Sequence, residues 1–358
     1  MTKFLIHGGY FSRNYGDYVL IDKTIKKIKS VTPQAEVGLA MAPASVREEF
    51  KNTIDNITVK NILSVDKVLF TGGGYLGERD FRIFKWSILC VYRQILLPIL
   101  CIIFNKPYAY FGVEVGPLRY KFLSWLVGRV LDRAKFVLVR NEFSQDFCLS
   151  IMKNKSLVSL ATDFAQNKKF LSSYDSSGFI LNEGEKYIGI HVTKYLSKYN
   201  DFCDDISRTI KSFENKDYKI VFFTDSPSHN NLINDESFIF KDVFDKEKHI
   251  FIPYKGPELT TCLLGSLSAV ITSKLHVGIV GLTMGCVPLS LPSHNKTIHY
   301  YNQVGYPELC LYKSSSDTLS QSLRRFIELI DSNSISLPSK SIEAEQLINL
   351  KIKEFVTN

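Results

Sequence analysis

Hydrophobic and polar positions follow two alternating rhythms along this 358-residue chain. Short apolar runs rich in valine, isoleucine and phenylalanine are separated by longer stretches whose apolar residues recur with helical spacing. Such strand–helix alternation predicts a parallel sheet with helices on both faces. In the first half we expect strands at Lys3–His7, Glu36–Ala40, Lys67–Thr71, Tyr108–Gly112, Phe136–Val139 and Val158–Thr162, and helices at Asp17–Val31, Ala44–Asn52, Phe81–Asn105, Tyr120–Ala134 and Glu142–Met152.

A polar, serine-rich interval at residues 167–186 interrupts this alternation, which then resumes. Further strands are expected at Tyr187–Val192, Lys219–Thr224, His249–Pro253, Ala269–Thr272 and Val287–Leu291, and helices near Asp317–Ile330 and Ile342–Val356. We therefore predict an α/β protein of two doubly wound Rossmann-like domains with an intervening cleft. The expected divisions are an N-terminal domain at 1–166, a linker at 167–186, a C-terminal domain at 187–335, and a C-terminal helix at 336–358 that could pack back on the N-terminal domain.

The net charge of +8 is concentrated in one stretch. Residues 81–135 hold nine cations and two anions, a net charge of +7, and are also the most hydrophobic part of the chain. Arg93 and Pro98 argue against a membrane-spanning helix there. One interpretation is a basic, apolar surface that lies on anionic lipid. The other is a buried core helix whose cations extend to solvent. The cations lie among aliphatic side chains, so nucleic acid is not expected as a partner.

Composition and missing motifs exclude several classes of protein. The chain is 45% hydrophobic and 22% charged, which is typical of a globular protein. Its seven cysteines lack metal-ligand spacing, so we expect free thiols, a reducing cytoplasm and no metal site. The N-terminus enters a strand directly, so no signal peptide is expected. The motifs of serine hydrolases, zinc metalloproteases and metal-dependent sugar-nucleotide enzymes are absent.

A cation and an imidazole follow the expected strand at Ala269–Thr272. Lys274 and His276 come directly after it and precede a small, apolar helical run. Ligands of open α/β sheets bind beyond the carboxyl ends of strands. The pair therefore favours an anionic substrate that undergoes acid–base chemistry. The alternative is a buried, hydrogen-bonded histidine beside a solvated lysine.

Two glycine-bearing segments also follow strands. Asn14 and Gly16 suit a tight turn, and Asp17 either caps the next helix or contacts a ligand. Gly72-Gly73-Gly74 favours a functional loop over a merely tight turn, because three glycines in succession suit unusual backbone angles. Neither segment is a GxGxxG fingerprint or a P-loop.

Other charged or titratable residues also lie at expected strand ends. Arg140 suits a carboxylate or a phosphate, although it could instead pair structurally with Glu142 or Asp163. Asp163 could orient a partner or simply cap. His191, Asp225 and His229 lie near strand ends in the second half. For each of those three alone, a structural role is the simpler interpretation.

Several of these segments, taken in order, resemble the polysaccharide pyruvyl transferase family. The matching segments are Asn14-Tyr15-Gly16-Asp17, Gly72-Gly73-Gly74-Tyr75-Leu76, Gly112–Leu118, Val139–Ser144, Thr162–Phe164, Ser273–His276 and Gly285–Pro288. The resemblance implies a fold similar to glycosyltransferases of the two-Rossmann (GT-B) type. It also implies transfer of pyruvate from phosphoenolpyruvate, as a ketal, onto a sugar of a cell-surface polysaccharide or its lipid-linked precursor.

The resemblance also suggests roles for individual residues. The family's Arg-Leu-His falls on Lys274, Leu275 and His276, with lysine in place of arginine, and its strand-end arginine falls on Arg140. These positions imply donor binding by Arg140, Lys274 and Leu275 and acid–base catalysis by His276. The residues assigned to the acceptor or to loops of the site are Asn14, Gly16, Asp17, Gly72, Gly73, Gly74 and Asp163.

The same resemblance suggests partners and a location. Phosphoenolpyruvate is a co-substrate, and no cofactor or metal is required. The acceptor is expected to be a glycan carried as a polyprenyl-linked oligosaccharide, with the basic, apolar surface holding the protein at the inner face of the cell membrane. Two alternatives stay open: a GT-B-type glycosyltransferase with a nucleotide-sugar donor, and a non-catalytic relative in glycan assembly.

Overall fold

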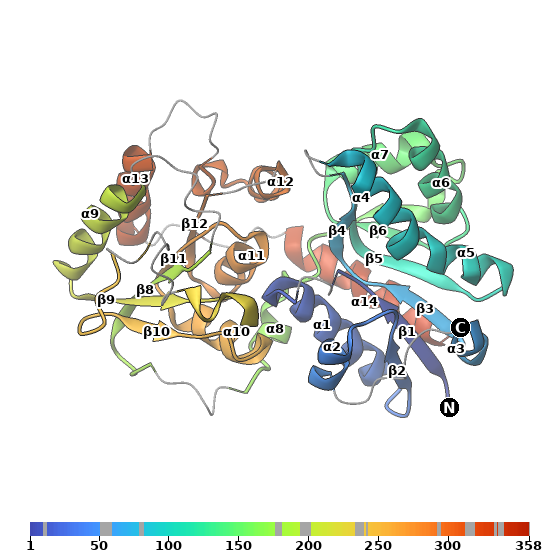
Figure 1. Cartoon of the computed structure of the whole chain (residues 1–358), viewed down its shortest axis with the longest axis horizontal. Coiled ribbons are helices and arrows are strands. Elements are labelled where there is room, and N and C mark those ends of the chain that lie inside the picture. Colours follow the sequence, from blue (N-terminus) through green and yellow to red (C-terminus); the bar gives the residue numbers. More distant parts are fainter. Residues whose placement is uncertain are drawn as a thin grey trace. The chain divides into compact units, whose positions relative to one another are not determined.

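The chain forms two compact α/β units, seen in a computed structural model (Figure 1). Unit 1 comprises Met1–Arg13, Asp17–Phe164 and Ser339–Asn358, and unit 2 comprises Asn14–Gly16 and Ala165–Pro338. The prediction of two α/β domains built on parallel sheets is confirmed, because one parallel sheet has seven strands and the other has five. The structure describes residues 1–9, 13–50, 59–78, 82–175, 181–193, 202–232, 240, 243–291, 295–311, 319–332, 335 and 340–357.

The sheet of unit 1 has the strand order β2-β1-β3-β5-β6-β7, with β4 also paired to β5. Its strands are β1 Lys3–His7, β2 Glu36–Leu39, β3 Lys67–Phe70, β4 Gly73–Leu76, β5 Tyr108–Val115, β6 Val137–Val139 and β7 Val158–Leu160. Its helices are α1 Tyr15–Val31 (whose first two residues belong to unit 2), α2 Ala44–Glu49, α3 Val59–Ser64, α4 Ile83–Cys90, the π-helix η2 Val91–Ile95, α5 Leu96–Ile103, α6 Lys121–Leu131, α7 Glu142–Ile151, the 3-10 helix η3 Lys155–Leu157 and α14 Lys340–Thr357.

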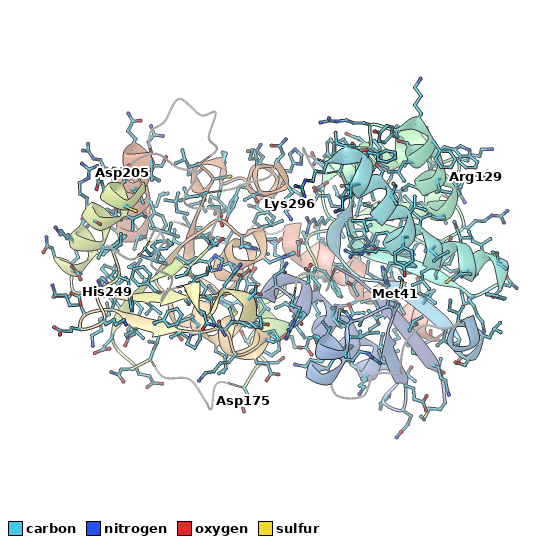
Figure 2. All side chains as sticks on the ribbon, viewed as in Figure 1. Met41, Arg129, Asp175, Asp205, His249 and Lys296 are labelled. Carbon is cyan, nitrogen blue, oxygen red and sulfur yellow. The ribbon has the colours of Figure 1, made fainter. Side chains whose placement is uncertain are left out.

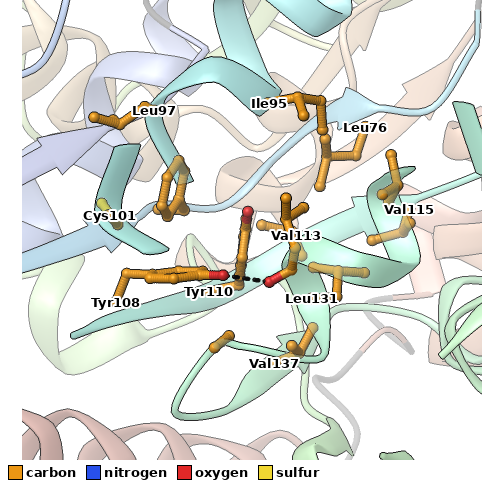
Figure 3. Close-up of a cluster of buried hydrophobic side chains, with 14 of the residues drawn as sticks. Leu76, Ile95, Leu97, Cys101, Tyr108, Tyr110, Val113, Val115, Leu131 and Val137 are labelled. Atoms are coloured by element: carbon orange, nitrogen blue, oxygen red, sulfur yellow. Dashed lines mark hydrogen bonds between the residues drawn. The ribbon is translucent and has the colours of Figure 1, made fainter. Parts of the chain in front are cut away.

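Strand β5 separates two packed layers of unit 1, because successive side chains of a strand point to opposite faces. Tyr108 and Tyr110 are buried in a core that includes residues of η2, α5 and α6 (Figure 3). On the opposite face, Phe111 meets Phe355 of α14 edge to face at 6.4 Å. Helix α14 therefore covers one face of the sheet, while α4, η2, α5 and α6 cover the other.

The expected glycine loop is a strand in the structure. Gly73 and Gly74 begin β4, which continues the line of β3 along the same edge of β5. The register of β5 against β6 shifts between Tyr110 and Val113, and Gly112 within that shift has φ +68°. Gly73 has φ +141°, and a Cβ on Gly72 would lie 3.0 Å from the carbonyl oxygen of Gly112. The glycines thus let two paired strands bend together at close range.

Unit 2 has a five-stranded parallel sheet in the order β10-β9-β8-β11-β12. Its strands are β8 Lys186–His191, β9 Tyr218–Phe223, β10 Ile250–Ile252, β11 Ala269–Thr272 and β12 Val287–Ser290. Its helices are α8 Lys168–Leu171, α9 Phe202–Glu214, the 3-10 helix η5 Pro227–His229, α10 Pro257–Ser266, α11 Leu275–Met284, α12 Asn295–Val304, the 3-10 helix η7 Pro307–Leu309 and α13 Leu319–Ser332. The hydrophobic pattern did not predict α8, α9, α10 or α12. Helix α8 lies in the interval expected as a linker, of which residues 176–180 lie outside the described residues.

Candidate functional site

Three neighbouring strands of unit 2 deliver polar side chains to one edge of the sheet. His191 is the last residue of β8, Asp225 lies just after β9, and Thr272 ends β11. The strand order β9-β8-β11 makes these strands neighbours, although they are distant in sequence. The carboxyl ends of parallel strands meet at a single edge, which is where open α/β sheets bind ligands.

Asp225 is the centre of this cluster. Its Oδ1 lies 3.0 Å from Nδ1 of His229 and 3.3 Å from Nε2 of His191. Its Oδ2 lies 3.8 Å from Nζ of Lys274. The Thr272 hydroxyl bonds to Nδ1 of His191 at 3.0 Å and accepts the backbone N–H of Lys274 at 3.0 Å. A closed ring of contacts therefore fixes both the backbone and the side chain of Lys274.

Burial and charge set the protonation of this cluster. Burial lowers the pKa of His191, although the charge of Asp225 opposes the shift, so the ring is neutral at neutral pH. Burial alone would raise the pKa of Asp225. His191, His229 and Lys274 outweigh that effect and hold the pKa well below its usual value. Asp225 is therefore a buried carboxylate whose charge is balanced by Lys274.

Lys274 stands at the start of helix α11. It is the N-cap residue, and its side chain is 26% exposed. Leu275, the first residue of the helix, is buried, and His276 follows in the first turn with its side chain half-buried. The N-terminus of a helix carries partial positive charge and favours anions. A cation, a helix N-terminus and an imidazole are thus gathered where an anionic ligand could bind.

The segment Asn14–Gly16 packs against this same site in unit 2. A Cβ on Gly16 would lie 2.0 Å from Nδ1 of His276, so the ring occupies the space that any side chain would need. The Tyr15 backbone N–H donates to the carbonyl oxygen of Asp225 at 2.8 Å, and its hydroxyl bonds to Thr261 at 2.7 Å. Sterics therefore explain why residue 16 is glycine, because any side chain there would clash with the His276 ring.

Asn14 and Asp17 flank this contact. Asn14 is half-buried, just before α1 begins at Tyr15. Asp17 belongs to unit 1 and lies in the first turn of α1, so it is not the N-cap residue that one interpretation expected. Its carboxylate lies against Gly9, where a Cβ would come 2.7 Å from Oδ1. A carboxylate in the first turn interacts favourably with the helix dipole.

A second buried cluster lies at the equivalent edge of the sheet in unit 1. Arg140, which follows β6, donates from Nη1 to Asp163 at 2.7 Å and from Nη2 to Glu114. Glu114 lies in β5, and Asp163 follows β7. Burial would lower the pKa of Arg140, but the charges of Glu114 and Asp163 outweigh it and raise the pKa. Both terminal nitrogens of this arginine are therefore bonded to carboxylates of its own unit.

A buried lysine adjoins this second cluster. Nζ of Lys23 donates to the carbonyl oxygen of Phe164 at 2.6 Å and to Glu345 of α14 at 3.1 Å. It also lies 4.4 Å from the centre of the Phe164 ring. Burial lowers its pKa to about 8, although Glu345 opposes that shift. Lys23 thus fastens α14 to the segment that follows Asp163.

The structure brings some of the expected site residues together and separates others. Lys274, Leu275, His276, Asn14 and Gly16 gather in unit 2, whereas the remainder lie in unit 1: Arg140, Asp163, Asp17, Gly72, Gly73 and Gly74. His191, Asp225 and His229 could be recognised in the sequence near strand ends, but their grouping with Lys274 was not predicted. The sequence feature that these residues share is their position at or after the carboxyl ends of strands.

Two further residues were missed. Thr272 was expected only as the end of a strand, and Glu114 only as part of the matching segment Gly112–Leu118. Within the residues that the structure describes, no group of histidine, cysteine, aspartate and glutamate is arranged to hold a metal ion.

The chain has two α/β units, each built on a parallel sheet with a polar cluster at its carboxyl edge. This is a GT-B-like fold, and solved structures with the same fold support the assignment. The chain is similar to UDP-GlcNAc 2-epimerase from Methanocaldococcus jannaschii, with a TM-score of 0.64 and 10% identity over 98% of this chain and 99% of that chain. It is similar to a putative UDP-N-acetylglucosamine 2-epimerase from Listeria monocytogenes, with a TM-score of 0.61 and 12% identity over 100% and 98%. The Neisseria meningitidis UDP-GlcNAc 2-epimerase bound to UDP-GlcNAc gives a TM-score of 0.58 and 12% identity over 99% and 100%.

The family follows from sequence. The polysaccharide pyruvyl transferase family model matches residues 14–295, which include both clusters. The chain belongs to the polysaccharide pyruvyl transferase family, as its motifs predict. No curated protein matches the chain in sequence.

Proposed function

We propose that this protein transfers pyruvate from phosphoenolpyruvate onto two hydroxyls of a sugar, forming a ketal in a capsule, exopolysaccharide or cell-wall glycan. One observation supports this most directly. By resemblance, Lys274 and His276 fall on the family's Arg-Leu-His motif. Lys274 is the N-cap of α11 and His276 lies in its first turn, with the Gly16 backbone packed against the imidazole.

The donor carries a carboxylate and a phosphate, so it requires positive charge. In our proposal Lys274 and the N-terminus of α11 supply that charge. Asp225 holds the lysine near this position through its Oδ2. Lysine lacks the planar fork with which arginine binds a carboxylate through two parallel hydrogen bonds. The donor's anion is therefore recognised here by charge more than by paired hydrogen bonds.

The reaction consists of two additions at one carbon. A proton is added to C3 of phosphoenolpyruvate, and the C2–C3 double bond becomes a methyl group and an electron-poor C2. A sugar hydroxyl attacks C2 and loses its proton. The bond from C2 to the phosphate oxygen then breaks, the second hydroxyl attacks C2 and closes the ring, and its proton leaves with the phosphate. The products are the ketal and inorganic phosphate.

His276 is the proposed proton carrier. An imidazole changes charge near neutral pH, so it can donate a proton to C3 or accept one from the attacking hydroxyl. His191 is fully buried and faces Asp225, so it is assigned a positioning role. Through Thr272 and Asp225 it sets where Lys274 lies.

Arg140 stays a predicted donor-binding residue by its position in the family motif. Its terminal nitrogens already donate to Glu114 and Asp163, so an anion would compete with these carboxylates. Lys274 is therefore the main donor cation in the proposed scheme. The acceptor is assigned to Asn14, Gly16, Asp17, Gly72, Gly73, Gly74 and Asp163, as the family resemblance implies.

The acceptor and the location are also part of the proposal. We infer a polyprenyl-linked oligosaccharide as the acceptor, so the protein would act in the cytoplasm at the inner face of the cell membrane. Family membership supports a polysaccharide acceptor. The charge of the chain between residues 81 and 135 supports an anionic lipid surface nearby.

A mass measurement tests the reaction. The protein is incubated with phosphoenolpyruvate and a panel of lipid-linked and nitrophenyl glycosides, and products are weighed by mass spectrometry. The expected product gains the mass of one pyruvate less one water and appears with free phosphate. In parallel, phosphoenolpyruvate should raise the thermal midpoint, whereas uridine diphosphate should not. Stabilisation by uridine diphosphate alone, with no pyruvylated product, would reject the proposal in favour of a nucleotide-sugar enzyme.

A further inference from the structure

One surface of unit 1 exposes large apolar side chains on adjacent helices. The exposed members on α4, η2 and α5 are Phe84, Ile88, Leu89, Tyr92, Leu96, Ile102 and Ile103, and those on and just before α6 are Tyr120, Phe122 and Trp125. We call these ten residues the apolar face. Contiguous exposed apolar patches on soluble proteins mark sites for partners or membranes.

The helical run from Ile83 to Ile103 has two different sides. Phe84, Ile88, Tyr92 and Leu96 recur every four residues along the exposed side. Residues such as Leu97 and Cys101 point the other way and are buried in the core against β5 (Figure 3). The run of 21 residues is long and apolar enough to cross a membrane by composition. Its buried side is already packed on the sheet, so it can lie on a bilayer but not span one.

The π-helix η2 fastens this run to the sheet. It places Gln94 on the inner side, where Oε1 accepts a hydrogen bond from Nε2 of His7 at 2.8 Å. Both residues are buried, and burial lowers the pKa of His7, which keeps the ring neutral. A π-helical turn contains one residue more than an α-helical turn, so it changes the direction in which the following side chains point. The buried side therefore stays anchored while the apolar face stays outward.

Helix α6 continues the apolar face. It packs beside η2 and contributes Leu123 and Val127 to the same core, so its outer side also faces away from the sheet. Phe122 and Trp125 are 69% and 57% exposed and stack with ring centres 5.8 Å apart. Aromatic rings of this kind are favoured at the interface between lipid and water.

Cations lie on the same helices as the apolar face. Lys85 lies on α4 among the exposed apolar residues, and Lys121 and Arg129 lie on α6, one turn on either side of Trp125. Arg129 extends outward from α6 (Figure 2). Of the two anions between residues 82 and 135, Glu114 is buried beside Arg140, and Asp132 accepts the backbone N–H groups of Lys153 and Asn154. The helices that carry the apolar face, α4, η2, α5 and α6, contain cations and no aspartate or glutamate.

We propose that the apolar face and the cations on its helices dock unit 1 on an anionic phospholipid bilayer, with the run Ile83–Ile103 lying parallel to the surface. Apolar side chains would enter the acyl boundary while the cations meet lipid phosphates. Docking of this kind brings the enzyme to a lipid-linked acceptor, and in that one respect the inference rests on the proposed function. The choice of lipid over a protein partner rests on the cations that lie among exposed apolar and aromatic residues on the same helices.

Vesicle flotation tests the docking without any substrate, so its outcome is independent of the pyruvyl transfer. Purified protein is mixed with vesicles of phosphatidylcholine alone or of phosphatidylcholine with phosphatidylglycerol. We expect co-flotation with the anionic vesicles, weaker binding to the neutral ones, and a loss of binding as salt is raised. Absence of the wild-type protein from the anionic vesicles at low salt would overturn the proposal.

Matched variants locate the surface. Phe84→Ser and Trp125→Ser should each lower binding to anionic vesicles about tenfold, because each removes a large inserted side chain. Leu350→Ser is the apolar control, since Leu350 is exposed on α14 on the opposite face of the sheet, and it should bind as the wild type does. Lys85→Glu and Lys121→Glu should each lower binding about fivefold or more, whereas Lys353→Glu on α14 should not.

The same variants also test the alternative, in which a second copy of this chain covers the apolar face. If the apolar face were an interface between two copies of this chain, light scattering would show a dimer that Phe84→Ser converts to a monomer. That outcome, or equal loss of lipid binding in Phe84→Ser and Leu350→Ser, contradicts the proposal. A monomeric wild type whose binding falls only in the apolar-face variants supports it.

Discussion

Units 1 and 2 each carry a buried polar cluster at the carboxyl edge of a parallel sheet, yet the two clusters are built differently. In unit 1 the cation Arg140 is buried and bonded to two carboxylates, at 2.7 Å for Asp163. In unit 2 the cation Lys274 lies 3.8 Å from Asp225, and its side chain is partly exposed. The first arrangement satisfies a charge internally, and the second holds a charge where solvent and ligands reach it.

The two clusters are expected to differ in whether they matter for folding stability or for the reaction. A buried ion pair does little for stability when intact, but removing one partner is strongly destabilising. A partly exposed cation held at longer distance can exchange its contacts at small expense. We therefore expect changes at the unit 1 cluster to affect folding and changes at the unit 2 cluster to affect turnover.

The largest expected effect is on turnover at His276. His276→Ala should lower kcat by about 100- to 10,000-fold, the usual contribution of a general acid or base. Phosphate release from phosphoenolpyruvate in the presence of an acceptor measures it. The thermal shift produced by the donor should persist, because Lys274 is intact. Near-normal phosphate release would remove His276 from the chemistry.

At the unit 1 cluster, the prediction concerns folding. Arg140→Leu leaves Glu114 and Asp163 buried without their cation, so the free energy of unfolding should fall by about 3–5 kcal/mol. Lys274→Met is the comparison in unit 2 and should lower it by less, because Lys274 is partly exposed at 3.8 Å and Oδ1 of Asp225 keeps its contacts with His191 and His229. Urea unfolding of both variants makes the comparison. Equal losses would mean that the two clusters do not differ as described.

Lys23 offers a test by pH. Its pKa falls from 10.5 in an exposed lysine to about 8 in the fold. Between these values the unfolded chain binds the proton and the folded chain does not, so stability rises with pH, by about 3 kcal/mol in total. Below about pH 8 the buried charge is retained and this gain is absent.

The measurement is urea unfolding of the wild type and of Lys23→Met at pH values on both sides of this range. As the pH rises, the free energy of unfolding of the wild type should increase relative to that of Lys23→Met. Lys27→Met removes a partly exposed lysine 3.4 Å from the same Glu345 and should leave that pH dependence in place. A pH-independent difference for Lys23→Met would show that the amine is not buried as a charged group.

The smallest expected effect is on donor affinity at Lys274. Lys274→Met should weaken phosphoenolpyruvate binding about 10- to 100-fold, the range of a hydrogen bond to a charged group. Calorimetric titration measures it. Lys274→Arg keeps the charge and adds the planar fork, so affinity should be retained or improved. Tight donor binding by the methionine variant would shift the donor site toward Arg140.

Most strands could be predicted from the sequence because buried parallel strands are short, apolar and β-branched. The expected bounds of β1 and β11 match the structure. Strand β4 could not be predicted, since three consecutive glycines carry no pattern of side chains and only the pairing with β5 makes them extended. Helix α10 was also missed, although its first turn begins at Pro257, a common helix start.

The site was only partly predictable for a different reason. Each strand-end residue was visible in the sequence, but its neighbours depend on strand order. His191, Asp225 and Thr272 meet because β8 lies between β9 and β11. The approach of His276 to Gly16 joins residues 260 positions apart in the chain, and no local pattern reveals it. The role of Arg140 also stayed open, because its partners Glu114 and Asp163 belong to two other strands or strand ends whose positions the sequence does not give.

The return of α14 to unit 1 has a consequence for synthesis on the ribosome. Lys23 meets Glu345, which lies 322 residues later, and Lys67 donates to the carbonyl oxygens of Phe355 and Val356. The part of the unit 1 sheet that α14 covers is therefore left open until residues 340–357 have been translated. Unit 2 has all its residues by Pro338. Domains usually complete their folding in order from the N-terminus, but here the unit that starts first is completed last.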